Sequence, residues 1–262
     1  MDVQVDGCRA HAATGSRPIN NQERAVIFIH GAGMDRTVWQ LQTRNVAYMG
    51  RQVYSVDLPG HGRSEGQALS SVAEMADWII RFMDAANVQT ASLIGHSMGA
   101  LVALECAARN PDRLDKLCLM GVAEEMPVHP ALLEAAQQNL PIASELIVFW
   151  GVGEEAQRGG HPHPGLWVHG ASQTLLDMSR PGVLYSDLNA CNTYKSATER
   201  ATSVNCETLF ILGHQDKMTP VKSARSLSAA ITLSSTEVID RSGHMMMLER
   251  PDEVHKALTS FI

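Results

Sequence analysis

The sequence has 262 residues, of which 45% are apolar and 19% are charged. This length suits one large domain or two modest ones, and the composition is that of a globular protein, not of a disordered or fibrous one. The 21 basic and 28 acidic residues give a formal net charge of −7, and no basic run stands out. These features argue against a nucleic-acid partner.

Neither a membrane span nor a secretory signal is expected. No apolar stretch approaches the roughly 20 residues that cross a bilayer, and the N-terminus lacks a basic start followed by an apolar core. The odd number of cysteines and the absence of a C-x-x-C pair favour reduced, buried thiols and a cytoplasmic location. The cysteines are Cys8, Cys106, Cys118, Cys191 and Cys206.

Short apolar or β-branched runs alternate with longer helical patterns from about residue 25 onward. The predicted strands are 25–29, 52–56, 91–94, 116–120, 208–212 and 236–239. Runs that are apolar on both faces indicate parallel strands covered by helices on each side. The alternation predicts an α/β fold with a mainly parallel twisted sheet.

The alternation stops between residues 124 and 200, where helical patterns occur without a convincing strand. The predicted helices are 130–139, 141–150, 172–178 and 183–194, and a loop rich in glycine, proline and histidine at 159–165 separates them. We expect an inserted helical cap (lid) at 124–200, with a core domain formed by 1–123 and 201–262.

The most informative segment is Gly95-His96-Ser97-Met98-Gly99, which joins a predicted strand to a predicted helix. A serine on such a sharp turn has a strained backbone, so its neighbours must be nearly free of side chains. The hydroxyl is then exposed at a helix N-terminus. The pattern arises by chance in roughly one chain in ten of this length, but chance rarely places it between a strand and a helix.

A serine nucleophile needs a general base, and the base needs an anionic partner. His244 follows the last predicted strand and Asp216 follows the one before it, so both meet Ser97 at the carboxyl edge of the sheet. Glu124 and Glu125, after the 116–120 strand, are the rival acids. Asp57 also ends a strand, but its loop is interpreted as a structural corner.

An oxyanion hole is expected beside the nucleophile. The segment 30–33 follows the first strong strand and has small residues, so its backbone N–H groups can face a ligand. We assign one donor to Ala32 and the other to Met98. His30 and His96 flank the site, and we interpret them as hydrogen-bonding groups that hold the loop backbones.

These motifs resemble the α/β-hydrolase superfamily over nearly the whole chain, and in particular its capped serine hydrolases of the esterase and lactonase kind. They are His30-Gly31-Ala32-Gly33, Asp57-Leu58-Pro59-Gly60-His61-Gly62-Arg63-Ser64, Gly95-His96-Ser97-Met98-Gly99, Gly213-His214-Gln215-Asp216 and Gly243-His244. The resemblance implies an eight-stranded sheet, an antiparallel leading strand at 3–7 and a helical cap after the sixth strand. It implies no particular substrate.

The substrate pocket is expected to be apolar. Thioether and aromatic side chains near the catalytic loops and in the cap would form an adaptable wall, with Trp150, Trp167, Met218 and Met245 as candidates. We therefore expect an uncharged, moderately apolar acyl substrate. His161, His163 and His169 are interpreted as loop residues, and no metal or other cofactor is expected.

The predicted activity is hydrolysis of a carboxylic ester, lactone or thioester through an acyl-enzyme, with Ser97, His244 and Asp216 as the triad. The same serine machinery could cleave a carbon–carbon bond beside a ketone. A hydrolase-fold small-molecule receptor with slow turnover, or acyl transfer to an acceptor other than water, also stays open. The sequence leaves the oligomeric state undetermined.

Overall fold

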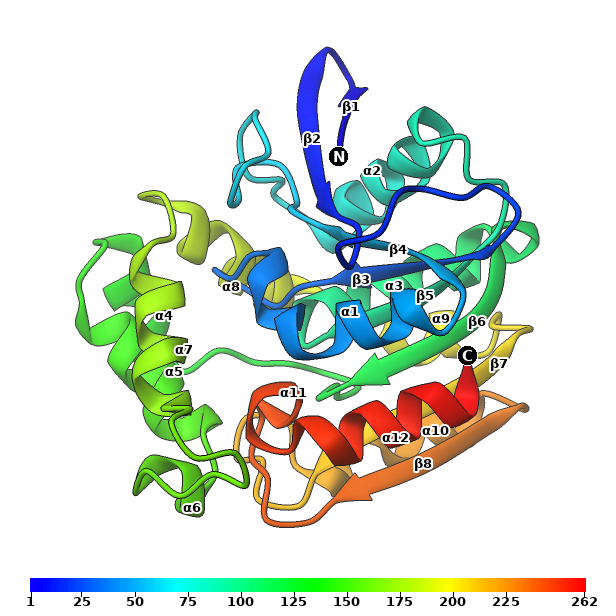
Figure 1. Ribbon diagram of the computed structural model, residues 1–262. Coiled ribbons are helices and arrows are strands. Elements are labelled where there is room, and N and C mark those ends of the chain that lie inside the picture. The colour runs from blue at the N-terminus through cyan, green and yellow to red at the C-terminus, as the bar shows by residue number, and fades with distance from the viewer.

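The computed structural model describes all 262 residues and contains one eight-stranded sheet (Figure 1). Its strand order is β1-β2-β4-β3-β5-β6-β7-β8. The strands are β1 (Asp2–Val5), β2 (Cys8–Ala13), β3 (Arg24–Ile29), β4 (Arg51–Val56), β5 (Ala91–His96), β6 (Leu114–Met120), β7 (Glu207–Gly213) and β8 (Ser234–Ile239). The pairings from β4 through β8 are all parallel, as the alternation of strands and helices predicts.

The first two strands form an antiparallel hairpin at one edge of the sheet. Its turn is Asp6-Gly7, and both residues have positive φ angles (52° and 77°), which is the backbone that a two-residue hairpin turn requires. The antiparallel leading strand implied by the resemblance is therefore present, followed by β2, which pairs antiparallel with β4. No apolar run marked β2, because its polar side chains reach the surface.

Helices cover both faces of the sheet. One apolar cluster joins the sheet to α2, α3, α9 and α10, and a second joins it to α1, α11 and α12, which lie in front in Figure 1. These helices are α1 (Gln40–Tyr48), α2 (Val72–Ala85), α3 (Met98–Arg109), α9 (Ala197–Ala201), α10 (Arg225–Ala230), α11 (Met246–Glu249) and α12 (Pro251–Phe261). Short 3-10 turns are Arg36–Trp39, Pro111–Arg113 and Val221–Ala224.

Six helices lie between β6 and β7, and the first five of them gather beyond one end of the sheet (Figure 1). These inserted helices are α4 (Pro130–Gln137), α5 (Ile142–Gly151), α6 (Glu154–Gln157), α7 (Val168–Asp177) and α8 (Val183–Thr193). The prediction found four of them, and missed the single turn of α6 and the first turn of α7. The next helix, α9, packs on α3 and α10, although its first residues fall inside the predicted cap segment.

The parallel strands point their carboxyl ends toward the inserted helices (Figure 1). The loops that follow β3, β5, β7 and β8 therefore lie at the boundary between the sheet and these helices, where α/β proteins place their ligand sites. No helix combines the length and the apolar character that a transmembrane segment needs.

Candidate active site

Ser97 occupies a strained turn between β5 and α3. Its backbone has φ 54° and ψ −117°, a conformation that is costly for a residue with a side chain. A Cβ atom on Gly95 would collide with the carbonyl oxygen of Gly99, and one on Gly99 would collide with that of Ile29. Both flanking positions must therefore be glycine, for the steric reason that the sequence suggested.

His244 and Asp216 form a buried pair on the loops after β8 and β7. The Nδ1 atom of His244 lies 2.7 Å from Oδ2 of Asp216, and both side chains are almost fully buried. The Oδ1 atom of Asp216 accepts hydrogen bonds from the backbone N–H groups of Met218 and Thr219, each at 2.8 Å. Although burial alone raises the pKa of Asp216, His244 and Thr219 lower it to about 2, so the carboxyl group is ionised at neutral pH.

Thr219 is a part of the site that the sequence analysis missed. Its hydroxyl donates to Oδ2 of Asp216 at 2.7 Å and lies 3.2 Å from Nδ1 of His244. A buried carboxylate needs several donors, and a hydroxyl three residues after an acid is well placed to supply one. The Asp216-x-x-Thr219 spacing was the available signal.

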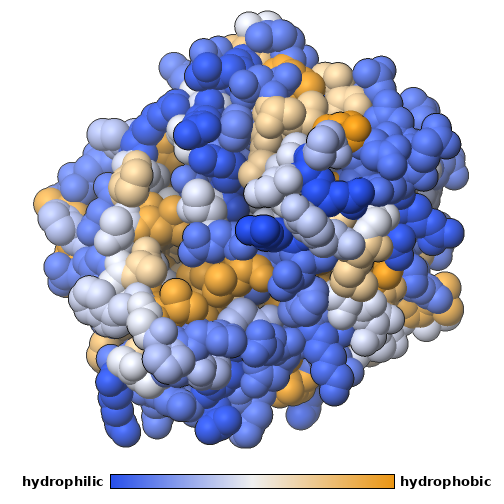
Figure 2. Space-filling view, viewed as in Figure 1, coloured by the Kyte–Doolittle hydropathy of each residue, from blue (hydrophilic) through white to orange (hydrophobic).

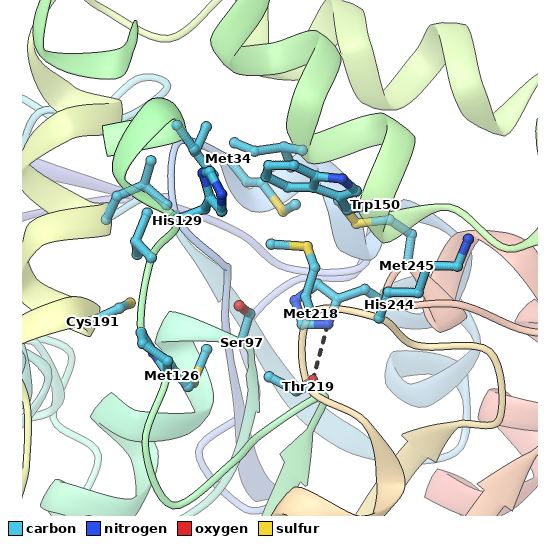
Figure 3. A pocket seen from close by; sticks show the side chains of 17 residues that line it. Met34, Ser97, Met126, His129, Trp150, Cys191, Met218, Thr219, His244 and Met245 are labelled. Atoms are coloured by element: carbon cyan, nitrogen blue, oxygen red, sulfur yellow. Dashed lines mark hydrogen bonds between the residues drawn. The ribbon is translucent and has the colours of Figure 1, made fainter. Parts of the chain in front are cut away.

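The other ring nitrogen of His244 faces the cavity. Nε2 has no hydrogen-bond partner in the protein, although it is buried. Ser97 and His244 both line the same cavity, and Figure 3 shows the two side chains on its lower side with the hydroxyl of Ser97 at the cavity floor. The structure thus pairs His244 with Asp216 and places Ser97 on the same cavity, while no hydrogen bond joins Ser97 to the free imidazole nitrogen.

The expected oxyanion donors also lie beside Ser97. Ala32 lines the cavity, and Met98 is the first residue of α3, so its backbone N–H belongs to the helix turn that lacks intrahelical acceptors.

The two neighbouring histidines hold the loop backbones, as interpreted from the sequence. His30 accepts from the N–H of Leu58 at 3.2 Å and donates to the carbonyl oxygen of Gly31 at 2.9 Å. His96 donates from Nε2 to the carbonyl oxygen of His244 at 2.9 Å. Burial lowers the pKa of His30 to about 4 and that of His96 to about 3, so both rings are neutral.

The rival acids do not reach His244. Asp57 is fully buried and accepts from the backbone and side chain of Arg36 and from the N–H of Arg63, so it is the structural corner that the sequence suggested. Glu124 and Glu125 are exposed, and they pair with Ser226 and Lys195.

The cavity over Ser97 has a volume of about 300 Å³ and mostly apolar walls. Trp150, Met218 and Met245 line it, as predicted, together with His129, which the sequence analysis did not consider. Figure 3 shows Trp150 and His129 above Ser97. Figure 2 shows a band of apolar side chains between the inserted helices and the sheet domain.

The prediction for Trp167 was wrong. This side chain does not line the cavity; it is 64% exposed and stacks on His169 at the start of α7. The reason is geometric, since a ring that packs on its own helix turn cannot also reach the cavity.

The histidines of the 159–165 loop contact α11 and α12. His161 bonds through Nε2 to the carbonyl oxygen of Leu248 at 2.8 Å, and His163 lies 3.2 Å from a carboxylate oxygen of Asp252. No group of three or more histidine, cysteine, aspartate or glutamate side chains is arranged to hold a metal ion.

A serine, a histidine and an aspartate at the carboxyl edge of a parallel sheet are typical of α/β-hydrolases. The family model of the alpha/beta hydrolase family matches residues 26–257, so the chain belongs to that family. It is a hydrolase of the esterase and lactonase kind, as the motifs indicated.

Several curated proteins are similar over nearly their full length. Pimeloyl-[acyl-carrier protein] methyl ester esterase of Serratia marcescens is 26% identical, over 93% of this chain and 96% of that protein. The 3-oxoadipate enol-lactonase 1 of Acinetobacter baylyi is 25% identical, over 95% and 93%. Among solved structures, an enol-lactonase from Burkholderia xenovorans has a TM-score of 0.88 at 20% identity and covers 100% of this chain and 99% of that one. A thermophilic esterase has a TM-score of 0.81 at 28% identity, over 100% and 96%.

Proposed function

We propose that the protein is a serine hydrolase that cleaves a carboxylic ester, lactone or thioester through an acyl-enzyme. The observation that carries the proposal is the buried His244–Asp216 pair, whose free imidazole Nε2 faces the same cavity as Ser97. In this scheme Nε2 takes the proton of Ser97 as Oγ attacks the substrate carbonyl, and the ionised Asp216 stabilises the imidazolium.

The tetrahedral intermediate carries its negative charge on the former carbonyl oxygen. The N–H groups of Ala32 and Met98 would bind this oxygen, where one donor is typically worth about 3 kcal/mol in the transition state. His244 then gives its proton to the leaving group. Water, deprotonated by the same imidazole, attacks the acyl-enzyme and releases the acid and Ser97. No metal or organic cofactor takes part in these steps.

The walls of the cavity favour an uncharged, moderately apolar acyl group. Met34, Met218 and Met245 offer flexible thioethers, and Trp150 offers an aromatic face. A volume of about 300 Å³ suits a small substrate. Relatives named as a methyl ester esterase and an enol-lactonase support ester and lactone bonds before thioesters.

We also propose that the inserted helices act as a cap over the site. Residues 124–200 would form this unit and 1–123 with 201–262 the core, with α9 packing on the core side. Trp150, at the end of α5, supports the proposal because it lies above Ser97 on the opposite side of the cavity (Figure 3).

The proposal is tested by labelling with a fluorophosphonate and by a substrate screen. Ser97 Oγ is expected to bond to phosphorus with loss of fluoride, which peptide mass analysis locates, and Ser97→Ala is expected to be unlabelled. Turnover of p-nitrophenyl esters, lactones and thioesters of increasing acyl length is then compared with that of Ser97→Ala. Folded protein that leaves Ser97 unlabelled and hydrolyses none of these compounds would overturn the proposal.

A further inference from the structure

A carboxylate from the inserted helices reaches the loop that carries Ala32. Asp187 lies on α8 and is fully buried. Its Oδ2 atom accepts from the backbone N–H of Gly33 at 2.8 Å and contacts Nε2 of His61 at 2.8 Å. Its Oδ1 atom is buried without a partner. An isolated carboxylate is expensive to bury, so this side chain depends on the two contacts.

His61 supplies the charge that offsets that of Asp187. Its Nδ1 atom lies 2.9 Å from the carbonyl oxygen of Pro59, which can only accept a hydrogen bond, so Nδ1 carries a proton. Its Nε2 atom faces a carboxylate and carries the second proton. The pair is therefore a charge-assisted hydrogen bond between α8 and the 57–64 loop, buried on both sides.

The hydrogen bond to Gly33 fixes the peptide unit between Ala32 and Gly33. Gly33 has φ +68°, and a Cβ atom there would lie 2.6 Å from Cδ1 of Leu184 on α8. The backbone of this loop thus packs directly on α8. Because the pinned peptide begins at Ala32, a change at Asp187 changes the orientation of the residue that we assign as an oxyanion donor.

We propose that Asp187 is a positioning residue that sets the oxyanion-binding loop from the inserted helices, through the N–H of Gly33 and the side chain of His61. The inference rests on the proposed function, since it assumes that Ala32 donates to the oxyanion. The docking of α8 against the sheet domain and the formation of the oxyanion hole then depend on each other. The hydrogen bond from Ala32 to the oxyanion in the transition state depends on the position of this loop more strongly than substrate binding does.

Glu105 provides a matched control. It is a buried carboxylate on α3 that accepts from the hydroxyl of Tyr194 at 2.7 Å and from Nε of Arg200 at 3.0 Å. It thus also ties the segment after α8 to the sheet domain. None of its contacts involves a loop of the active site, so its loss reports the cost of a buried carboxylate alone.

The test compares Asp187→Ala, Asp187→Asn and Glu105→Ala in the full chain by kcat, KM, fluorophosphonate labelling rate and thermal unfolding. Asp187→Ala is expected to lower kcat and the labelling rate by about 100-fold, because misplacing a catalytic group by 1 Å costs about that much. KM is expected to stay near the wild-type value. Asp187→Asn, which keeps an acceptor for Gly33, is expected to restore part of the rate. Glu105→Ala is expected to lose stability without this loss of kcat.

The outcomes separate the two proposals. Wild-type protein that neither turns over esters nor labels Ser97 overturns the proposed function. Active wild-type protein with a folded Asp187→Ala variant of unchanged kcat and labelling rate overturns the inference alone. Should Asp187→Ala fail to fold, Asp187→Asn decides: a lowered kcat at unchanged KM supports the role of Asp187, and wild-type kcat contradicts it.

Discussion

Glu249 is a buried acid whose removal is expected to cost much more than that of a surface acid. Its carboxylate accepts from three backbone N–H groups: Gly153 at 2.9 Å, Gly243 at 3.1 Å and Met245 at 3.2 Å. Glu249→Ala leaves all three amides without their acceptor. At about 2 kcal/mol for each buried amide, the loss is about 6 kcal/mol.

Part of this loss is offset, because burying the charge is itself costly. Burial raises the pKa of Glu249 from its usual 4.5 to about 6, which corresponds to about 2 kcal/mol at neutral pH. The net expectation is that Glu249→Ala lowers the free energy of unfolding by about 4 kcal/mol, a large part of the roughly 5–15 kcal/mol that typical domains possess.

Equilibrium unfolding in urea at pH 7 measures this difference. The control is Glu253→Ala, an exposed acid in the first turn of α12, which is expected to change stability by less than about 1 kcal/mol. A Glu249→Ala protein within about 1 kcal/mol of wild type would refute the reasoning, because it would mean that water or a local shift satisfies all three amides.

Three further predictions concern the site and its surroundings. Thr219→Val removes the hydrogen bond from the hydroxyl to Asp216 and is expected to lower kcat about tenfold, a loss of about 1.4 kcal/mol. Thr219→Ser is expected to retain activity in a p-nitrophenyl ester assay. Equal rates for both variants would contradict a role of the hydroxyl in holding Asp216. The pKa of His61 is raised above its usual 6.5, because the effect of Asp187 exceeds that of burial, which alone lowers the pKa. The titratable groups that face the His61 ring are His30, Asp57 and Asp187. The contribution of His61 to stability is therefore complete below about pH 6.5 and is lost as the pH rises through the raised pKa. The free energy of unfolding of wild type relative to His61→Gln should fall over that pH range. Parallel pH profiles of stability for the two proteins would refute this prediction. Trp150→Ala is expected to raise KM for longer acyl esters about tenfold through lost apolar contact, whereas Trp167→Ala leaves KM unchanged; the reverse order would contradict the assignment of the cavity wall.

The sequence predicted the parallel part of the fold because its signals are local. A buried strand such as β3 contains a continuous apolar run, and the strand-to-helix turn at Ser97 has a steric requirement for glycine that is visible in five residues. The hairpin strand β2 gave no such run, and Asp6-Gly7, which the resemblance placed within the leading strand, form the turn instead. Of the three residues named from their order along the chain, Asp216 and His244 are hydrogen-bonded to each other, and Ser97 lines the same cavity as His244.

The contacts that support the site were not predictable in the same way. Asp187 meets Gly33 across 154 positions, and Glu249 meets Gly153 across 96. Each depends on how a helix is docked, which no local pattern encodes. The incorrect assignment of Trp167 has the same origin, since tertiary packing decides which inserted helices line the cavity, and no residue of α7 does.

The attachment of the inserted helices at two places has a consequence for engineering substrate range by exchanging this segment between relatives. The carbonyl oxygen of Gly151, at the end of α5, accepts a hydrogen bond from the backbone N–H of His244 at 2.6 Å, and α8 carries Asp187, which binds Gly33. A segment from a relative replaces the residues that make both of these contacts. We therefore expect a chimera to have a lowered rate that is unrelated to the new residues lining its cavity. Grafts that keep 151–153 and the acid at 187 should separate specificity from speed.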